Sequence, residues 1–235
     1  MKPKVDCSAS QKEQVAEMFD SISGQYDLLN HVLSLGVDRW WRRSMVQRVR
    51  QRHPQSVLDV ATGTGDSAIA LKKSGAARIV GVDISAQMLK VAQAKPNAAG
   101  IEFVKADGEL LPFEDCCFEA VTIAFGLRNC EQRLQGLQEM RRVLKQNGTL
   151  VVLELSMPAN RILRSIYKLY FLRIVPLLGR LISRSSYAYR YLPYSVDEFP
   201  PRKAFVDEVR RAGFAEVKAA ALSGGLATIY EARKK

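Results

Sequence analysis

The fold of this chain is constrained most strongly by an alternation of short apolar runs with helix-like stretches, which begins at residue 56. Runs rich in valine and isoleucine are typical of strands, and strands that alternate with helices form a largely parallel sheet covered on both faces. The predicted strands are 56–60, 77–83, 101–105, 118–126, 148–155, 215–222 and 227–233. The predicted helices are 66–74, 85–95 and 131–145.

Several residues mark where these helices begin and end. Ser85 is a predicted N-cap, and Gly75 stands where the first helix should stop. The sequence SVDE at 195–198 has the pattern of a capping box, which predicts a helix from there to about Ala212. We expect one α/β domain, a Rossmann-like doubly wound sheet, over residues 1–235. Its predicted parts are a helical arm (1–50), an α/β core (51–157), a helical insertion (158–194) and a final helix with a β-hairpin (195–235).

The composition limits the class of protein. A chain of 235 residues with 47% hydrophobic content can bury one sizeable core. Its N-terminus lacks the apolar segment of a signal peptide, and no apolar run approaches the roughly 20 residues of a spanning helix. The four cysteines show no CxxC spacing and there are only two histidines, so we expect free thiols and no metal site.

The charge balance indicates an anionic partner. The chain has 35 basic and 24 acidic residues, a formal charge of +11, which suits nucleic acid or an anionic membrane surface. Residues 161–190 contain seven Lys/Arg and no acid, with apolar residues at helical spacing among them. We expect this segment to lie on a membrane, with the protein cytoplasmic and peripherally attached. An ordinary helix that packs inward is the alternative. The residues of this stripe are Leu163, Ile166, Tyr167, Tyr170, Ile174, Leu177, Leu178 and Leu181, with Pro176 expected to kink or end the helix, and Trp40, Trp41, Arg42 and Arg43 form a second predicted interfacial group.

The glycine loop LDVATGTGDSAIAL, at 58–71, follows the first strand. In a doubly wound sheet this loop lies at the carboxyl ends of the strands, where ligands bind. Gly63 and Gly65 fit the GxGxxA pattern of dinucleotide-binding folds, but Asp59 and Asp66 on either side would repel a pyrophosphate. S-adenosylmethionine carries a sulfonium and an ammonium and no phosphate, so these acids favour it as the ligand. Helix capping by Asp66 is the structural alternative.

Two further acids follow neighbouring strands. Asp83, at the end of the second strand, is expected to accept hydrogen bonds from the ribose hydroxyls. Asp107, after the third strand, is expected to accept from the exocyclic amine of adenine. Both positions agree with a nucleoside-containing methyl donor.

Several segments resemble those of known proteins. DVATGTGD (59–66), VDIS (82–85), KADG (105–108) and EMRRVLKQNG (139–148) are similar to class I methyltransferases. More narrowly, four segments resemble the ubiquinone/menaquinone biosynthesis C-methyltransferase family over about residue 15 to the end. These segments are YDLLNHVLSLGVDRWWR (26–42), FGLRN (125–129), ELSMP (154–158) and YLPYSVDEFP (191–200).

The resemblance implies a seven-stranded sheet with an antiparallel last strand, and transfer of a methyl group from S-adenosylmethionine to a ring carbon of a prenylated quinol. Ala124 stands where relatives often have serine, so one hydroxyl contact is lost. The predicted donor-site residues are Asp59, Gly63, Thr64, Gly65, Asp83, Ile84, Asp107, Gly108 and Ala124.

Four residues are candidates for the chemistry. Arg128 is expected to stabilise a phenolate as a permanent cation, and Asn129 to orient a hydroxyl or a water. A salt bridge and a helix N-cap are the structural alternatives for this pair. Tyr26 belongs to the arm expected to cover the donor. His31 is a candidate base, because histidine is the residue type that most often acts as one near neutral pH, although packing or capping also explains it. The general base is otherwise not identified.

The substrate is narrowed by resemblance and by absent motifs. The segments GVDRWWR and YRYLPYSVDEFP favour conversion of demethylmenaquinol to menaquinol, with a benzoquinol of the ubiquinone pathway as the alternative. A nucleic-acid methyltransferase is a more distant alternative. FGLRN stands where an Asn/Asp-Pro-Pro-aromatic motif would hold a base amine, and no Pro-Cys pair is present. The intact glycine loop argues against a fold kept only as a scaffold.

Overall fold

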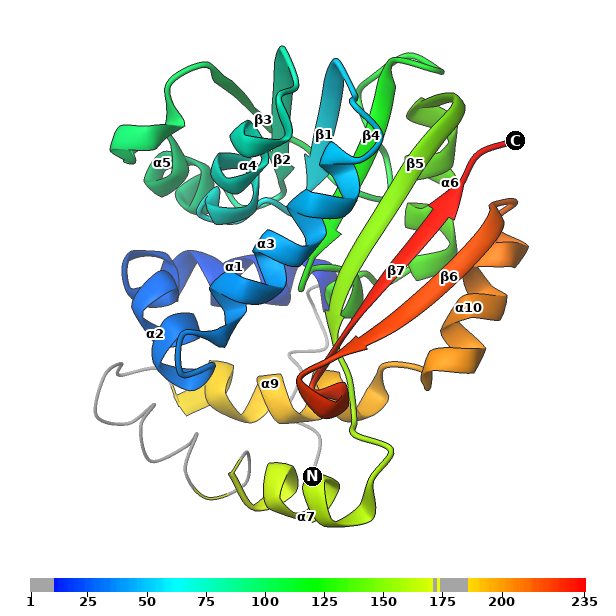
Figure 1. Cartoon of the computed structure of the whole chain (residues 1–235). Helices are drawn as coiled ribbons and strands as arrows, with labels where there is room; N and C mark the ends of the chain where they lie inside the picture. The colour runs from blue at the N-terminus through cyan, green and yellow to red at the C-terminus, as the bar shows by residue number, and fades with distance from the viewer. Residues whose placement is uncertain (1–10, 171–172, 174–185) are drawn as a thin grey trace.

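The computed structural model describes residues 11–170, 173 and 186–235. In this part of the chain seven strands form one mixed sheet in the order β3-β2-β1-β4-β5-β7-β6 (Figure 1). Strands β1 to β5 are parallel, and β7 is antiparallel to both of its neighbours, which confirms the predicted sheet and its antiparallel last strand. The strands are β1 (Ser56–Val60), β2 (Arg78–Asp83), β3 (Ile101–Lys105), β4 (Phe118–Ala124), β5 (Leu144–Leu155), β6 (Ala215–Leu222) and β7 (Ala227–Arg233).

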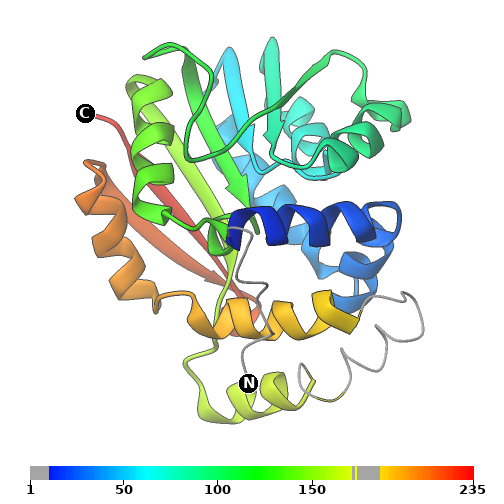
Figure 2. The same ribbon diagram turned by 180° about the vertical axis from the view of Figure 1, so that it is seen from behind.

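Helices cover both faces of the sheet, each over its own apolar core. Side chains alternate between the faces along each strand. Thus Val152 of β5 packs in the core with Leu137 and Phe205, whereas Val151 packs with Met45 on the other face. Figures 1 and 2 show these two layers from opposite sides. One face carries α3 (Val37–Arg50), α4 (Asp66–Leu71) and α5 (Ala86–Ala94), and the other carries α6 (Arg133–Val143) and α10 (Arg202–Arg211).

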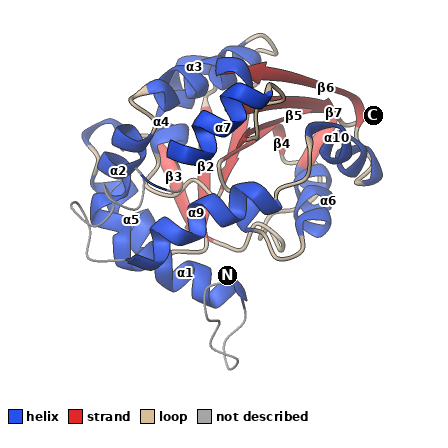
Figure 3. Ribbon diagram, turned by 90° about the horizontal axis from the view of Figure 1, so that it is seen from below, coloured by secondary structure: helices blue, strands red, loops and turns tan. Residues whose placement is uncertain are grey.

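The remaining helices lie across the end of the sheet at which the parallel strands finish (Figure 3). The helical arm and the insertion therefore cover the edge where a doubly wound sheet binds ligands. In the residues that the structure describes, no helix has both the length and the apolarity to cross a bilayer. The helices at this end are α1 (Gln11–Ile22), α2 (Tyr26–Leu33), α7 (Arg161–Leu169) and α9 (Ser186–Glu198).

Two predicted interfacial residues point inward instead. Trp41 is buried, and its Nε1 donates to Ser223 Oγ at 2.9 Å. Arg42 is also buried and forms an ion pair with Asp38. Of the group at 40–43, only Trp40 and Arg43 are exposed, because α3 uses its other face to pack on the sheet. The predicted stripe beyond Tyr170, with Pro176, lies outside the described residues.

The predicted start of the last helix is wrong. Residues 195–198 form the final turn of α9, and α10 begins at Arg202, directly after Pro200 and Pro201. Proline lacks an amide donor and disfavours helical geometry in the residue before it. The two prolines therefore separate the helices, and SVDE does not cap a new one. Two predicted helix ends are confirmed. Ser85 is an N-cap whose Oγ accepts from the Met88 amide at 3.0 Å, and Gly75 ends the first helix with φ of +86°.

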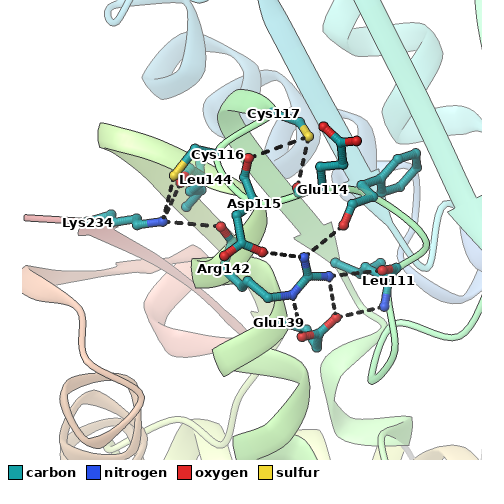
Figure 4. Close-up of polar contacts among 10 residues, drawn as sticks. Leu111, Glu114, Asp115, Cys116, Cys117, Glu139, Arg142, Leu144 and Lys234 are labelled. Carbon is teal, nitrogen blue, oxygen red and sulfur yellow. Dashed lines mark hydrogen bonds and ion pairs between the residues drawn. The ribbon is translucent and has the colours of Figure 1, made fainter.

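A long loop joins β3 to β4, and one arginine holds this loop in place (Figure 4). Arg142 of α6 donates to the carbonyl oxygens of Phe113 and Leu111 at 2.7 and 3.0 Å. The same guanidinium pairs with Glu139 at 2.7 Å and with Asp115 at 2.8 Å. This arrangement uses the planar fork of arginine, which can address several acceptors at fixed angles.

We expect Arg142→Lys to lower the free energy of unfolding by about 2 kcal/mol, because an ammonium cannot reach both loop carbonyls and both carboxylates. Urea denaturation measures the change. The matched control is Arg210→Lys, since Arg210 makes only an exposed ion pair with Asp207. Equal stability of the two variants would contradict a clamp by Arg142.

Candidate active site

The glycine loop leaves β1 through a series of left-handed residues. Ala61, Gly63 and Gly65 have φ of +51°, +56° and +82°. A Cβ on Gly65 would lie 2.9 Å from the Cβ of Ala92, so the close approach of α5 requires glycine there. The loop thus reaches the carboxyl end of the sheet as a tight, backbone-lined turn.

Asp59 supports this loop from below. Its side chain is fully buried, and its two oxygens accept hydrogen bonds from Thr62 Oγ1 and Thr122 Oγ1, both at 2.7 Å. Burial raises the pKa of Asp59 to about 6, although both threonine hydroxyls oppose the shift. Asp59 is therefore a buried brace between the loop and β4.

Asp83 lies at the end of β2 beside the loop. Its Oδ2 accepts from the Gly63 amide at 2.8 Å, and its Oδ1 from the Ser85 amide at 2.9 Å. Burial raises its pKa in spite of these bonds. The carboxylate is held rigidly at the wall of a cavity, where its remaining lone pairs can accept from a ligand.

That cavity, here called the donor cavity, has a volume of about 100 Å³ and lies at the carboxyl ends of β1, β2 and β4. Most of the residues predicted for the donor site meet there, from four separate parts of the chain. Asp59, Thr64 and Gly65 do not line it. The predicted residues that do are Gly63, Asp83, Ile84, Asp107, Gly108, Ala124, Tyr26 and Asn129.

Helix α1 supplies a wall that sequence reasoning missed. Val15 and Phe19 line the donor cavity, and Lys12 Nζ lies 2.5 Å from Asp107 Oδ2 and 2.7 Å from Glu109 Oε2. Burial acts to lower the pKa of Lys12, but the two carboxylates outweigh it and raise that pKa. Lys12 stands 95 positions before Asp107, and no local pattern indicates their contact.

Asp59 and Asp66, the acids predicted to flank the ligand, do not line the donor cavity, whereas the predicted Asp83 and Asp107 do. Asp59 lies beneath the loop, and Asp66 is turned away to pair with Lys95 at 2.5 Å. The N-cap of α4 is Gly65, so Asp66 does not cap it either. The carboxylates at the donor cavity are those of Asp83, Asp107 and Glu109.

A second cavity of about 310 Å³, here called the acceptor cavity, shares two wall residues with the first. Tyr26 and Phe125 line both cavities. The acceptor cavity is mainly apolar, and its walls come from α2, α3, α7 and the segment before β7. Its apolar lining consists of Leu33, Leu35, Val37, Trp41, Leu155, Leu163, Ile166, Tyr167, Tyr170 and Leu226, together with the two shared residues.

Arg128 lines the acceptor cavity but is not an unpaired cation. Its Nη1 donates to Glu154 Oε1 at 2.7 Å and to the Phe125 carbonyl at 2.5 Å. Burial, the largest single influence, acts to lower the pKa of Arg128, but Glu154, Tyr26 and Tyr191 together outweigh it, so the pKa is raised. The salt-bridge alternative therefore describes Arg128. Its Nε is buried and has no hydrogen-bond partner among the described residues.

Asn129 and His31 occupy different environments. Asn129 lines the donor cavity, and its Oδ1 accepts from the Tyr191 hydroxyl at 3.1 Å. Helix α6 starts later, at Arg133, so Asn129 is not its N-cap. His31 Nδ1 lies 2.9 Å from Asp38 Oδ2. Among the described residues that line the two cavities there is no histidine, so His31 is not placed as a base in either.

The sheet order, the antiparallel β7 between β5 and β6, and the acidic cavity beside the glycine loop together define a class I methyltransferase. The chain belongs to the ubiE/COQ5 methyltransferase family, whose model matches residues 7–234.

Named relatives match over nearly the full chain. The ubiquinone/menaquinone biosynthesis C-methyltransferase UbiE of Geotalea uraniireducens is 45% identical, over 94% of this chain and 97% of that protein. The demethylmenaquinone methyltransferase of Bacteroides fragilis is 42% identical over 94% and 93%. That of Deinococcus radiodurans is 44% identical over 100% and 98%.

Solved structures share the fold at low identity. A SAM-dependent methyltransferase of Thermotoga maritima, described as a possible histamine N-methyltransferase, has a TM-score of 0.64 and 20% identity, over 93% of this chain and 99% of that one. The [4+2]-cyclase SpnF has a TM-score of 0.65 and 18% identity, over 96% and 97%.

The raised pKa of Asp59 makes stability depend on pH in a definite direction. A carboxyl whose pKa is higher in the folded state stabilises the fold at low pH, and this contribution is lost as pH rises through the folded pKa of about 6. Relative to wild type, Asp59→Asn should therefore gain about 2–3 kcal/mol in unfolding free energy between pH 4 and pH 7. Urea denaturation of both proteins across this range measures the difference, and a constant difference would contradict the shift.

Proposed function

We propose that this protein transfers a methyl group from S-adenosylmethionine to a ring carbon of a prenylated quinol, converting demethylmenaquinol to menaquinol. The observation that carries the proposal is the pair of adjoining cavities. One is acidic and lies on the glycine loop, the other is apolar, and Tyr26 and Phe125 are common to both. A donor and a hydrophobic acceptor bound in the two cavities would meet at this shared wall.

The residues of the donor cavity suit S-adenosylmethionine. Asp83 presents a fixed carboxylate to the ribose hydroxyls, and Asp107 can accept from the adenine amine. Gly108 lets this wall of the cavity pack closely on β1, since a Cβ there would lie 2.9 Å from Val60 Cγ1. The described lining of the donor cavity has three acidic side chains against one lysine, Lys12, and this excess of negative charge favours a donor with positive charge.

When bound, S-adenosylmethionine supplies an electrophilic methyl group on a sulfonium. The chain must hold a reduced ring next to that methyl group and stabilise the charge of the quinol oxygen. Because the acceptor cavity is apolar, it excludes water and strengthens every polar contact inside it. Arg128 Nε is buried at this cavity and has no hydrogen-bond partner within the described part of the chain, so we assign it as the donor to a quinol oxygen. Glu154 fixes the guanidinium plane, so Arg128 acts as a directed hydrogen-bond donor.

Asn129 and Tyr26 complete the junction. The Asn129 amide oxygen is engaged by Tyr191, which leaves the amide NH₂ to donate toward the donor cavity. Tyr26 packs edge-on against Phe19 of α1 and covers the loop near Gly63. In the proposed reaction these two residues orient the ring, and the base is left unassigned.

The named relatives support the choice of quinol. Two of them are demethylmenaquinone methyltransferases, and another is named for both ubiquinone and menaquinone biosynthesis. A benzoquinol of the ubiquinone pathway is therefore the second candidate. A nucleic acid is a poor fit to an apolar acceptor cavity, so we propose no nucleic-acid partner.

We expect the purified protein to methylate demethylmenaquinol kept reduced, and to leave the oxidised quinone unmethylated because only the quinol ring carbon is nucleophilic. Mass spectrometry of the product detects the added methyl group. A benzoquinol precursor and tRNA are tested in parallel, with isotope-labelled S-adenosylmethionine as the donor in every reaction. Faster methylation of the benzoquinol would reassign the substrate, and methylation of RNA alone would overturn the quinol proposal.

Asp83→Ala should weaken binding of S-adenosylmethionine by about 2–3 kcal/mol, since it removes the acceptor for two hydroxyls. Calorimetry on the folded variant measures the loss. Asp115→Ala is the control, because Asp115 lies in the loop clamp away from the donor cavity. Unchanged affinity in Asp83→Ala would remove Asp83 from the ribose site.

We further propose that the protein meets an anionic membrane through the entrance of the acceptor cavity. Leu35 and Ile166 line that cavity and are 82% and 58% exposed, so apolar side chains surround its opening. Ile162 and Leu169 of α7 are also exposed. These four residues, with the exposed Arg161, Arg164 and Arg173, are called the entrance face. Exposed apolar residues beside basic ones are typical of a helix that lies on lipid, and a prenyl tail could pass there directly from the bilayer.

Replacing Arg161, Arg164 and Arg173 with glutamine should reduce binding to anionic vesicles about a hundredfold at low salt, at about 1 kcal/mol per residue. Activity on a long-tailed quinol in vesicles should fall, and activity on a short-tailed quinol in detergent should persist. Co-sedimentation measures binding. Glutamine at Lys203, Arg210 and Arg211 of α10 is the control of equal charge. Equal loss in both variants would indicate nonspecific attraction instead of an entrance face.

A further inference from the structure

The YDLLNH segment folds into α2, and two faces of this helix contact different parts of the protein. Tyr26, Asn30 and Leu33 are spaced by four and three residues, so they share one face of the helix. All three line the acceptor cavity, and Tyr26 lines the donor cavity as well. Asp27 and His31 are also four residues apart and lie on another face. This second face contacts the donor loop.

The contacts of the second face are polar and specific. Thr64 Oγ1 donates to Asp27 Oδ1. Lys95, the C-cap residue that follows α5, pairs with Asp27 Oδ2 at 2.6 Å and also with Asp66 at 2.5 Å. His31 Nε2 lies 3.7 Å from Asp66 Oδ2. Helix α2 is therefore fastened to both ends of the segment 64–66 of the loop that forms the donor cavity.

Thr64 was expected to contact the donor, but it does not line the donor cavity. Its side chain is buried, and its hydroxyl is directed at α2. The adjacent Gly63, in contrast, lines the donor cavity and donates its amide to Asp83. The loop thus presents one residue to the donor and the next to α2.

We propose that Asp27 is a positioning residue, which couples occupancy of the donor cavity to the shape of the acceptor cavity through Thr64. A donor that fixes Gly63 also fixes Thr64, and the Thr64–Asp27 bond transmits that order to α2. Tyr26, Asn30 and Leu33 are then held in place as the acceptor wall. Donor binding consequently prepares the acceptor cavity, and the donor binds before the quinol. The kinetic part of this inference rests on the proposed quinol methylation, and the link between loop and helix does not.

Thr64→Val tests the link, because valine keeps the shape of threonine and removes only the hydroxyl. Hydrogen exchange of the α2 amides is measured with and without S-adenosylmethionine. In the wild type the donor should slow exchange across residues 26–33 at least fivefold, and in Thr64→Val this protection should disappear. Asp207→Ala, which removes an exposed ion pair on α10, is the control and should behave as wild type.

Steady-state kinetics separate positioning from donor contact. Thr64→Val and Asp27→Ala should each lower kcat about tenfold while the Kd for the donor stays within twofold, and the double variant should be no worse than either. In Asp27→Asn the amide oxygen can still accept from Thr64. This variant should therefore retain most of the activity and the donor-induced protection of α2, whereas a general loss of folding would lower both. A Kd that rises in step with the fall in kcat would make Thr64 a direct donor contact and overturn the proposal, as would full donor-induced protection in Thr64→Val. If the wild type methylates no quinol but the difference in protection persists, the substrate assignment fails and the coupling stands.

Discussion

Beneath the glycine loop, the carboxylate of Asp59 accepts hydrogen bonds from Thr62 in the loop and from Thr122 in β4. These bonds hold the loop on the sheet at the point where the chain turns through left-handed residues, a geometry that strands and helices do not provide. The Gly63 amide is thereby aimed at Asp83, and the Thr64 hydroxyl at Asp27. Both cavities depend on this turn, because one is built on the loop and the other is bounded by the helix that the loop holds.

The sheet itself says little about the reaction. Solved structures with similar sheets and TM-scores near 0.65 include a possible N-methyltransferase and a cyclase. In this chain, helices lie over the carboxyl end of the sheet and add a second cavity. Helices α2 and α7, from the arm and the insertion, build an apolar cavity against the donor cavity. In the proposed reaction the covering helices therefore select the acceptor, on a fold that many methyltransferases share.

The strands and helices, and the meeting of several predicted residues at the donor cavity, could be predicted from the sequence because their signals are local. Apolar runs locate the strands to within a few residues, and the carboxyl ends of parallel strands bring Asp83 and Asp107 together without further information. The partners of charged side chains could not be predicted in this way. The pairings of Arg128 with Glu154 and of Lys12 with Asp107 join residues far apart in the chain, and they depend on how α1 and the strand ends meet in space. The capping box at 195–198 failed for a related reason, since two prolines next to it decide where a helix can begin.

The contact of Lys12 with Asp107 and Glu109 has a thermodynamic consequence for any ligand of the donor cavity. Asp107 and Glu109 both pair with the ammonium group of Lys12 in α1, so both carboxylates are already paired before a ligand binds. A ligand that hydrogen-bonds to Asp107 Oδ2 must share this oxygen with Lys12, so it gains less free energy than it would at an unpaired carboxylate. Helix α1 thus competes with the ligand for the same oxygen atoms. The first turn of α1 therefore affects how strongly a ligand binds at this face of the cavity.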